Sequence, residues 1–228
     1  MPTIVMVSPK GGAGKTTAAL ILATQIAQKS SVTVVDADPN RPIKSWADTD
    51  PPPKNITVIA DANEDNIIEC IEDAASKTPF VIVDLEGTAA KIVLLAVSQA
   101  DFVIIPMQGS QLDAEQASRA LRVIRQQEKI SRRAVPYAVL LTRTNPTIRT
   151  RTLNHIQNSL LSANVTVFQT ELHEREAFRA IFSLRKTLQG LKKTDVTNLD
   201  KAIINAEAFA TEVIEMLRKT NKQVRSDE

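Results

Sequence analysis

The chain has 228 residues, of which 43% are hydrophobic, and a formal net charge of +2, so its size and apolar content predict a single domain with a sizeable core. Its one cysteine, Cys70, excludes a disulfide framework and a cysteine-built metal site within one chain. No run approaches the ~18 consecutive apolar residues of a membrane span, and no signal peptide precedes the first expected strand, so we expect a cytoplasmic protein.

Segments with the patterns of strands and of helices alternate along the chain. The expected strands are residues 4–7, 32–35, 56–60, 80–83, 102–105, 137–141 and 165–168. The expected helices are residues 16–27, 66–75, 89–97, 113–129, 148–161 and 199–217. We therefore predict one domain over residues 1–219, followed by a polar flexible tail at 220–228.

Continuous apolar strands that alternate with helices indicate an α/β fold, in which a mostly parallel twisted sheet is covered by helices on both faces. Ligands of such sheets bind at the carboxyl ends of the strands. Asp36 and Asp84 each end an expected strand, and a glycine-rich loop follows the first strand. The sequence therefore predicts that these three segments meet at one ligand site.

The glycine-rich loop reads Lys-Gly-Gly-Ala-Gly-Lys-Thr-Thr and joins an expected strand to an expected helix, which is the context of a phosphate-binding loop. Glycines let the backbone curl, and amides at a helix N-terminus then donate to an anion. Lys15 would bridge the terminal phosphates, and the Thr16 hydroxyl would bind Mg²⁺. The residues expected to bind the nucleotide here are Gly11, Gly12, Ala13, Gly14, Lys15, Thr16 and Thr17.

A second lysine, Lys10, begins this loop, and Pro9 replaces the first glycine of the usual pattern. The loop resembles that of the deviant Walker-A ATPases, the ParA/MinD superfamily, and is closest to small plasmid-partition ParA (ParF-like) proteins. The resemblance covers residues 3–217 and implies a P-loop NTPase fold, ATP and Mg²⁺ as cofactors, and a homodimer that forms on ATP binding. It also implies that Lys10 reaches the partner's phosphates, where a cation stabilises the transferring phosphoryl group.

Two further motifs supply carboxylates. Residues 34–39, Val-Val-Asp-Ala-Asp-Pro, resemble the second motif of the superfamily, which implies that Asp38 orients the attacking water and that Asp36 supports the Mg²⁺ shell. Residues 80–84 have the Walker-B form, an apolar strand that ends in an acid, so Asp84 would hold Mg²⁺ through water. The expected catalytic residues are Lys10, Lys15 and Asp38, and the expected metal-site residues are Thr16, Asp36 and Asp84.

Two less specific assignments complete the expected site. The segment Leu-Leu-Thr-Arg at residues 140–143 resembles a strand end that lies near the adenine in small partition ATPases, which implies that Arg143 and Asn145 bind the nucleotide. Glu86, close behind the Walker-B strand, is interpreted as a switch-loop residue, and a general base is the alternative.

Basic residues gather between residues 119 and 151, where Glu128 is the only acid. Such clustering indicates a polyanionic partner, and a solvated helix face is the alternative. Residues 173–179 resemble a C-terminal segment that carries nonspecific DNA-binding arginines in the superfamily, and Arg175 and Arg179 are expected on one helix face. The alternative is that these arginines pair with Glu171 or Glu174 on a solvated helix. The expected DNA-binding residues are Arg149, Arg151, Arg175 and Arg179.

The resemblance implies a DNA-partition ATPase. In this hypothesis the ATP-bound dimer binds DNA nonspecifically, so the protein is nucleoid-associated in that state, and a ParB-type centromere-binding partner stimulates slow hydrolysis. One alternative is a VirC-like accessory ATPase of DNA transfer or processing. Another is a MinD-like membrane-associated division-site ATPase, which Pro9 and the polar end of the chain disfavour, so no stable membrane binding is expected. Reductases of the superfamily are excluded, because their bridging iron–sulfur cluster needs two cysteines per chain.

Overall fold

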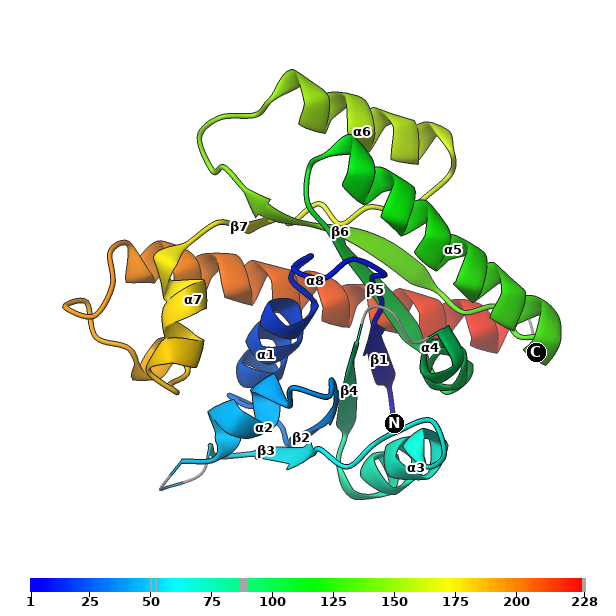
Figure 1. Ribbon diagram of the computed structural model, residues 1–228, viewed down its shortest axis with the longest axis horizontal. Helices are drawn as coiled ribbons and strands as arrows, with labels where there is room; N and C mark the ends of the chain where they lie inside the picture. The colour runs from blue at the N-terminus through cyan, green and yellow to red at the C-terminus, as the bar shows by residue number, and fades with distance from the viewer. Residues whose placement is uncertain (50, 52, 87–89, 227–228) are drawn as a thin grey trace.

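A parallel β-sheet forms the centre of the structure, a computed structural model that describes residues 1–49, 51, 53–86 and 90–226 (Figure 1). Within these residues the strand order is β3-β2-β4-β1-β5-β6-β7, and every described pair is parallel. The strands are β1 (Thr3–Met6), β2 (Val32–Ala37), β3 (Ile56–Ile59), β4 (Phe80–Leu85), β5 (Phe102–Met107), β6 (Tyr137–Thr144) and β7 (Leu172–His173). The predicted α/β fold with a mostly parallel sheet is confirmed.

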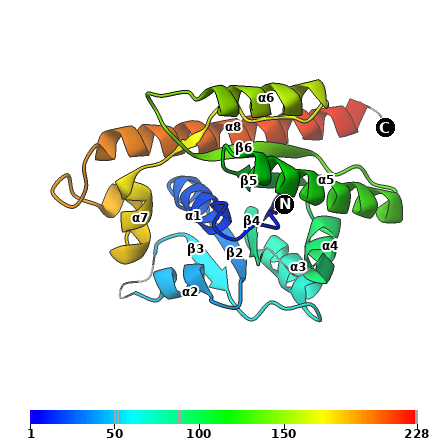
Figure 2. The ribbon, with the colours of Figure 1, turned by 45° about the horizontal axis from the view of Figure 1, so that its top comes forward.

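Helices cover both faces of the sheet, as Figures 1 and 2 show. One face carries α1 (Lys15–Ile26), α2 (Pro42–Ala47), α7 (Glu176–Ser183) and α8 (Leu199–Ser226). The other face carries α3 (Ile67–Lys77), α4 (Ala90–Ser98), α5 (Gln111–Ser131) and α6 (Arg151–Ser162). None of the helices, over their described residues, is long and apolar enough to cross a membrane.

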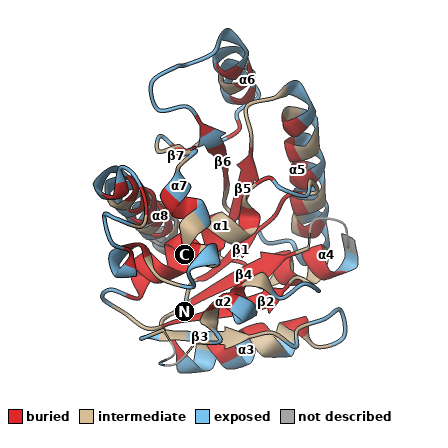
Figure 3. Ribbon diagram, turned by 60° about the vertical axis from the view of Figure 1, so that its left-hand side comes forward, coloured by how far each residue is buried: buried red, intermediate tan, exposed pale blue. Residues whose placement is uncertain are grey.

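The strands are apolar along their length because both of their faces pack against helices. In β1, Ile4 and Met6 point into the core under α1 and α8, whereas Val5 lies in the core under α4 and α5. Successive side chains of a strand point to opposite faces, so a strand covered on both sides needs apolar residues at every position. The colouring in Figure 3 shows the central strands buried, the edge strand β3 only partly buried, and the helices exposed on their outer sides.

Residues 165–168 do not form the last strand that the sequence predicts. Val167 forms only an isolated bridge with Val139, and the seventh strand lies further on, at Leu172–His173. Phe168 is buried, and its ring packs edge-on against the rings of Phe102 and Phe209. The Phe168 ring therefore packs between the sheet and α8. These tertiary contacts determine the position of Phe168 more than its strand propensity does.

The helices also differ from the expected ones in two places. The last predicted helix ends at residue 217, but α8 continues to Ser226, through most of the segment 220–228 for which the polar composition predicts a flexible tail. Lysine, arginine and glutamine are good helix formers, so polar composition alone does not end a helix. The short helix α2, which was not expected, begins with Pro42 at a position that favours proline.

The strand order places the expected ligand-binding segments at one edge of the sheet. β4 lies between β1 and β2, with Asp84 in register with Met6 on one side and with Asp36 on the other. All three strands end at this edge, where the chain of β1 continues into the glycine-rich loop. The carboxylates and the loop therefore face one another although residues 6 and 84 are far apart in sequence.

Candidate functional site

The loop between β1 and α1 has the curled backbone of a phosphate-binding loop. Gly12 and Gly14 have φ angles of 77° and 96°, a region that side chains with a Cβ rarely adopt. Gly14 is the N-cap of α1, and no side chain caps this helix end. Its free amides are therefore available to an anion, as the sequence predicts for phosphate groups.

Side chains at the ends of β5 and β6 hold this loop in place. The Thr142 hydroxyl at the end of β6 donates to the carbonyls of Ala13 (2.7 Å) and Met107 (3.1 Å). The Gln108 side-chain amide donates to the Gly12 carbonyl at 2.8 Å. A Cβ on Gly14 would lie 3.4 Å from Thr142, so this position has little room for a side chain. The loop is thus held in its curled form by β5 and β6.

Lys15 is a buried cation with no carboxylate within ion-pairing distance in the described structure. Its side chain is 8% exposed, and its Nζ lies 3.5 Å from the carbonyl of Lys10. Burial lowers the pKa of Lys15, and the charges of Asp84, Asp38 and Glu86 oppose this shift. An ammonium group in this position would gain its missing charge partner from a bound phosphate.

Asp84 is fully buried at the end of β4, and neither of its carboxylate oxygens has a hydrogen-bond partner among the described residues. Burial raises its pKa to about 7, and the charge of Asp36 adds to the shift, while the nearby Thr16 hydroxyl and the Lys15 ammonium oppose it. An ionised carboxylate without partners is costly in a protein interior. Its oxygens are therefore available to a cation.

Asp36 and Asp38 lie in different environments. Asp36 is 1% exposed, its Oδ2 accepts from the amides of Ile43 and Lys44 at 2.9 Å, and its Oδ1 has no partner among the described residues. Burial raises its pKa, and these amides oppose the shift. Asp38 is half-buried, and its Oδ1 accepts from the backbone and side-chain amides of Asn40 at 2.8 and 3.0 Å. Asp36 therefore caps α2, whereas Asp38 closes a turn beside the loop.

These residues fit a hydrated Mg²⁺ bound together with a nucleotide. The buried oxygens of Asp84 and the second oxygen of Asp36 lack partners, and the Thr16 hydroxyl lies beside Asp84. Within the described residues there is no group of three or more His, Cys, Asp or Glu residues that would hold a metal alone. Mg²⁺ commonly keeps several waters and uses one or two carboxylates plus substrate phosphates.

Asp113 also belongs to this site, although no motif in the sequence predicts it. The Lys10 ammonium lies 3.0 Å from Asp113 Oδ1, and the two side chains are 38% and 2% exposed. The Ser110 hydroxyl donates a short hydrogen bond to the other carboxylate oxygen, and its Oγ accepts from the Asp113 amide at 3.2 Å, which caps α5. The Ser-x-x-Asp spacing before the helix would have indicated the cap, but not the lysine.

A cavity beside the loop is lined by Gly14, Thr17, Thr142, Arg143, Leu172, His173, Glu174, Arg175, Phe178 and Arg179. Arg143, expected near the adenine, therefore lies beside the phosphate-binding loop. Asn145 does not line this cavity; its Oδ1 accepts from the amides of Thr147 and Ile148 at 2.9 and 3.0 Å and closes a turn. The structure thus brings one of these two residues to the loop.

The four expected DNA-binding arginines do not form one free surface. Arg149 pairs with Glu171 at 2.7 Å and also donates to Asn154 and Gln157. Arg179 pairs with Glu174 at 2.8 Å.

Arg175 lines the cavity, and its Nε is buried without a partner among the described residues. The expectation that Arg175 and Arg179 share a helix face is wrong, because Arg175 precedes α7 as its N-cap, with φ −137°. Arg151 is exposed in the first turn of α6.

Glu86 is half-buried, and its charge acts on Lys15. It also lines a hollow with Asp38, Arg41 and Asp61, so it lies close to the expected water-orienting residue Asp38. The three residues that follow it, 87–89, are outside the described part of the chain.

Comparisons with known proteins identify the family of the chain and confirm its fold. Residues 1–224 match the family model of the VirC1 protein. The chain is 39% identical over 218 residues to Protein ParA of Rhizobium radiobacter, covering 95% of this chain and 98% of that protein. It is 28% identical to Protein virC1 of Rhizobium rhizogenes over 79% of this chain and 80% of that protein. An ATP complex of Cyanothece McdA has the same fold, with a TM-score of 0.73 at 17% identity, over 93% of this chain and 96% of that one.

Proposed function

We propose that this protein is an ATP-driven DNA-partition ATPase, since the chain belongs to the VirC1 family and to the ParA/MinD superfamily of ATPases. The observation that carries the proposal is the loop with two lysines. Lys15 is buried and has no carboxylate partner among the described residues, whereas the ammonium of Lys10 is paired with Asp113 of α5. Lys15 would therefore bind the nucleotide of its own chain. Lys10 would leave Asp113 and bind the nucleotide of a second chain.

ATP would bind with its phosphates against the free amides of the loop and the ammonium of Lys15. The cavity that includes Thr17 and Arg143 lies directly beside the loop and would take the nucleoside. Mg²⁺ would bridge the phosphates and neutralise the charge that develops on them. Thr16 and Asp84 would hold it, directly and through water, and Asp36 would support its water shell.

Asp38 would orient the attacking water. Its Oδ1 accepts from Asn40, so the carboxylate is fixed by a turn and keeps a second oxygen for a water. An acceptor in a fixed position lowers the barrier mainly by positioning, which is most of what phosphoryl transfer requires of a protein. We expect slow basal hydrolysis, because the site also needs Lys10 of a second chain.

Dimerisation on ATP binding would complete the site. In the single chain, Lys10 forms an ion pair with the buried carboxylate of Asp113. Phosphates of a second chain would offer Lys10 a stronger anion, so that the pair with Asp113 opens only when a nucleotide-bound partner is present. The lysine would then stabilise the transferring phosphoryl group across the interface.

The ATP-bound dimer would bind DNA without reading its sequence, and a ParB-type centromere-binding protein would stimulate hydrolysis and release it. In this proposal the protein is cytoplasmic, is nucleoid-associated when ATP-bound, and makes no stable contact with membranes. The 39% identity to Protein ParA over nearly the whole of both chains supports this proposal.

The test is DNA binding measured with ADP, with ATP and with a non-hydrolysable ATP analogue. We expect binding with ATP and with the analogue, and little binding with ADP. Equal affinity in all three states would contradict an ATP switch. Binding that persists unchanged from about 50 to 200 mM salt would contradict phosphate contacts as its source.

A second candidate function is that of a VirC-like accessory ATPase of DNA transfer or processing, which the match of the VirC1 family model over residues 1–224 favours. Both functions use the same nucleotide chemistry, but one serves the partition of DNA and the other its transfer or processing. Deletion of the gene in the host separates them: partition predicts loss of a plasmid during growth without selection, whereas a transfer role predicts normal inheritance with reduced DNA transfer.

A further inference from the structure

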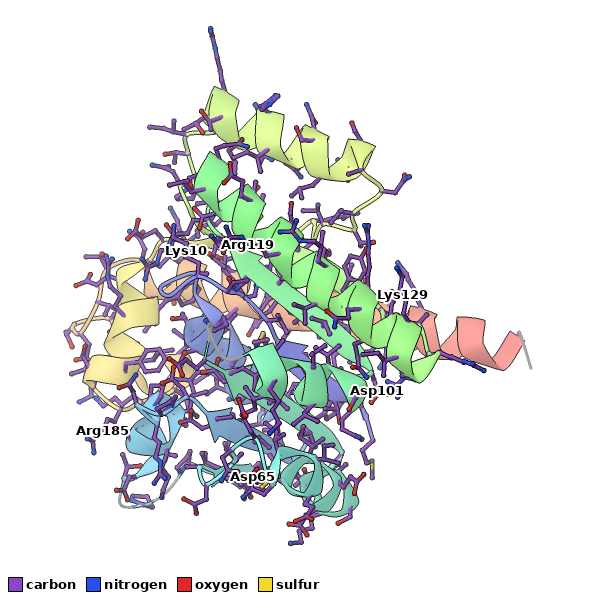
Figure 4. All side chains as sticks on the ribbon, turned by 45° about the vertical axis from the view of Figure 1, so that its right-hand side comes forward. Lys10, Asp65, Asp101, Arg119, Lys129 and Arg185 are labelled. Carbon is purple, nitrogen blue, oxygen red and sulfur yellow. The ribbon has the colours of Figure 1, made fainter. Side chains whose placement is uncertain are left out.

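A row of basic side chains runs along the outer side of α5. Arg119, Arg122, Arg125 and Lys129 are all exposed, and Figure 4 marks Arg119 and Lys129 on this helix. At 100° per residue the four lie within an arc of about 120° on the helix surface and extend over about 15 Å of its axis. We call these four residues the α5 basic row.

The α5 basic row faces away from the protein core. The buried residues Ala117, Leu121 and Ile124 lie on the opposite side of the helix, where they pack in the core between α5 and the sheet. The apolar side of α5 is therefore already covered. The exposed side of α5 therefore offers mainly positive charge to an external partner. The exposed apolar side chains on this helix, Leu112 and Ile130, lie near its two ends.

These four cations have no charge partner within the described part of the chain: none of their side chains makes a hydrogen bond or an ion pair. Glu115, one turn before Arg119, is the acid on the same side of the helix, and Glu128 is turned away and accepts from the Val135 amide at 3.0 Å. By contrast, the guanidinium groups of Arg149 and Arg179 are engaged by Glu171 and Glu174. Unpaired like charges in a row repel one another, and a polyanion would remove that repulsion.

A DNA backbone fits this row better than a lipid surface does. About 15 Å of duplex carries roughly nine phosphate charges, so four cations in a row would meet a dense line of anions. An interfacial membrane helix needs an exposed apolar face beside its basic one, and the apolar face of α5 is covered by the protein itself. Lysine and arginine in a row on one helix face suit phosphate contacts, which position a protein without reading bases.

The same helix is connected to the nucleotide loop. Asp113, which holds Lys10, lies in the first turn of α5, about 9 Å along the axis from Arg119. A two-fold dimer that forms when Lys10 leaves Asp113 would carry two such rows on one particle. Two linked binding surfaces raise the affinity for one long ligand beyond that of either surface alone.

We propose that the α5 basic row (Arg119, Arg122, Arg125 and Lys129) is the surface through which the ATP-bound dimer contacts the phosphates of double-stranded DNA. The proposal rests on the proposed partition function and adds to it the surface that carries the DNA. It replaces the four arginines expected from sequence as the main contact, because at least two of those are engaged in ion pairs.

The test compares two variants that each remove three positive charges. One is Arg119→Gln/Arg122→Gln/Arg125→Gln on α5, and the matched control is Lys201→Gln/Arg218→Gln/Lys219→Gln, whose exposed residues lie on α8 at the opposite face of the sheet. The affinity of each ATP-bound protein for a random-sequence duplex is measured by fluorescence anisotropy at several salt concentrations. Retained ATP turnover shows that the nucleotide site of each variant is intact.

We expect the α5 variant to bind at least tenfold more weakly than the control. The slope of log K against log salt concentration should fall by about three for each protomer engaged, because each lost phosphate contact removes about 0.9. The variant with lysine at the same three positions should keep most of the affinity, since phosphate contacts require charge. If the triple variant fails to fold, Arg122→Gln alone should lower the slope by about one for each protomer engaged.

Three results would overturn the proposal in distinguishable ways. If the wild type binds DNA with ATP and the α5 variant binds as tightly as the α8 control, the surface is wrong and the partition function stands. If the wild type binds no duplex in any nucleotide state, the partition function fails and the surface proposal with it. If the wild type instead binds phosphatidylserine vesicles and the α5 variant does not, the row serves a membrane and the choice of DNA is wrong.

Discussion

The buried carboxylate of Asp84 should destabilise the nucleotide-free protein at neutral and alkaline pH, so Asp84→Asn should make that form more stable. In the folded protein burial raises the pKa of Asp84 from 3.8 to about 7. A group with a raised folded-state pKa holds its proton in the folded chain after the unfolded chain has lost it. The free energy of unfolding therefore falls as the pH rises from about 4 to about 7, and the loss is complete above that range.

The size of this destabilisation follows from the shift in the pKa of Asp84. One pKa unit corresponds to about 1.36 kcal/mol. The rise in the pKa of Asp84 from 3.8 to about 7 therefore lowers the free energy of unfolding at pH 8 by about 4 kcal/mol. The amide of asparagine would itself be buried with unsatisfied hydrogen-bonding groups, which costs about 1–3 kcal/mol. The net gain expected at pH 8 is therefore about 1–3 kcal/mol, or a rise in Tm of roughly 2–12 °C for a chain of this size.

The assay is thermal unfolding followed by circular dichroism without nucleotide or Mg²⁺, at pH 8 and at about pH 5. Asp61→Asn, which removes an exposed carboxylate, controls for the loss of one negative charge. The gain should be clear at pH 8 and much smaller at pH 5, where the carboxyl of the folded wild type is protonated and only about a third of the destabilisation is present. The reasoning is refuted if Asp84→Asn is no more stable than the wild type at pH 8, or if its gain is the same at both pH values.

Three further substitutions test individual contacts. Lys15→Ala should lower ATP affinity at least about tenfold in equilibrium dialysis, because it removes the buried cation that meets the phosphates; unchanged affinity would contradict that role. Arg149→Ala should lower the free energy of unfolding in urea by about 1–2 kcal/mol, because it leaves the mostly buried Glu171 unpaired. The control is Arg151→Ala at an exposed residue nearby, which should change the free energy of unfolding by no more than about 0.5 kcal/mol. Equal losses in the two variants would argue against a structural role for Arg149. Asp113→Asn should reduce severalfold the protein concentration at which the ATP-bound dimer forms in size-exclusion chromatography, because Lys10 loses its charged partner; an unchanged or higher concentration would show that the pair does not oppose dimerisation.

The parts of the site that were predictable from sequence are those whose geometry is local. The phosphate-binding loop is contiguous, and its glycines at 12 and 14 have the positive φ angles that such a loop requires. Asp36 and Asp84 were placed together by one general rule, that parallel strands present their carboxyl ends at the same edge. The register between them in β2 and β4 agrees with that rule.

The parts that were not predictable depend on which distant segments become neighbours. Asp113 meets Lys10 because β5, which precedes α5, lies beside β1 in the sheet, and nothing near residue 10 indicates that order. The charge of Arg149 favours a DNA contact, but Glu171 lies close enough in the fold to pair with it. Phe168 likewise has the propensity of a strand residue, and its contacts with Phe102 and Phe209 place it elsewhere.

The central claim is that the loop is half of a site completed by Lys10 of a second chain, and mixing two inactive variants tests it most directly. Lys10→Ala lacks the lysine that is given to the partner, and Asp38→Ala lacks the residue that orients water in its own site. Because half of randomly formed two-fold dimers are mixed and each mixed dimer has one complete site, an equimolar mixture should recover about a quarter of the wild-type ATPase rate. A mixture no more active than the sum of its two components would contradict the claim.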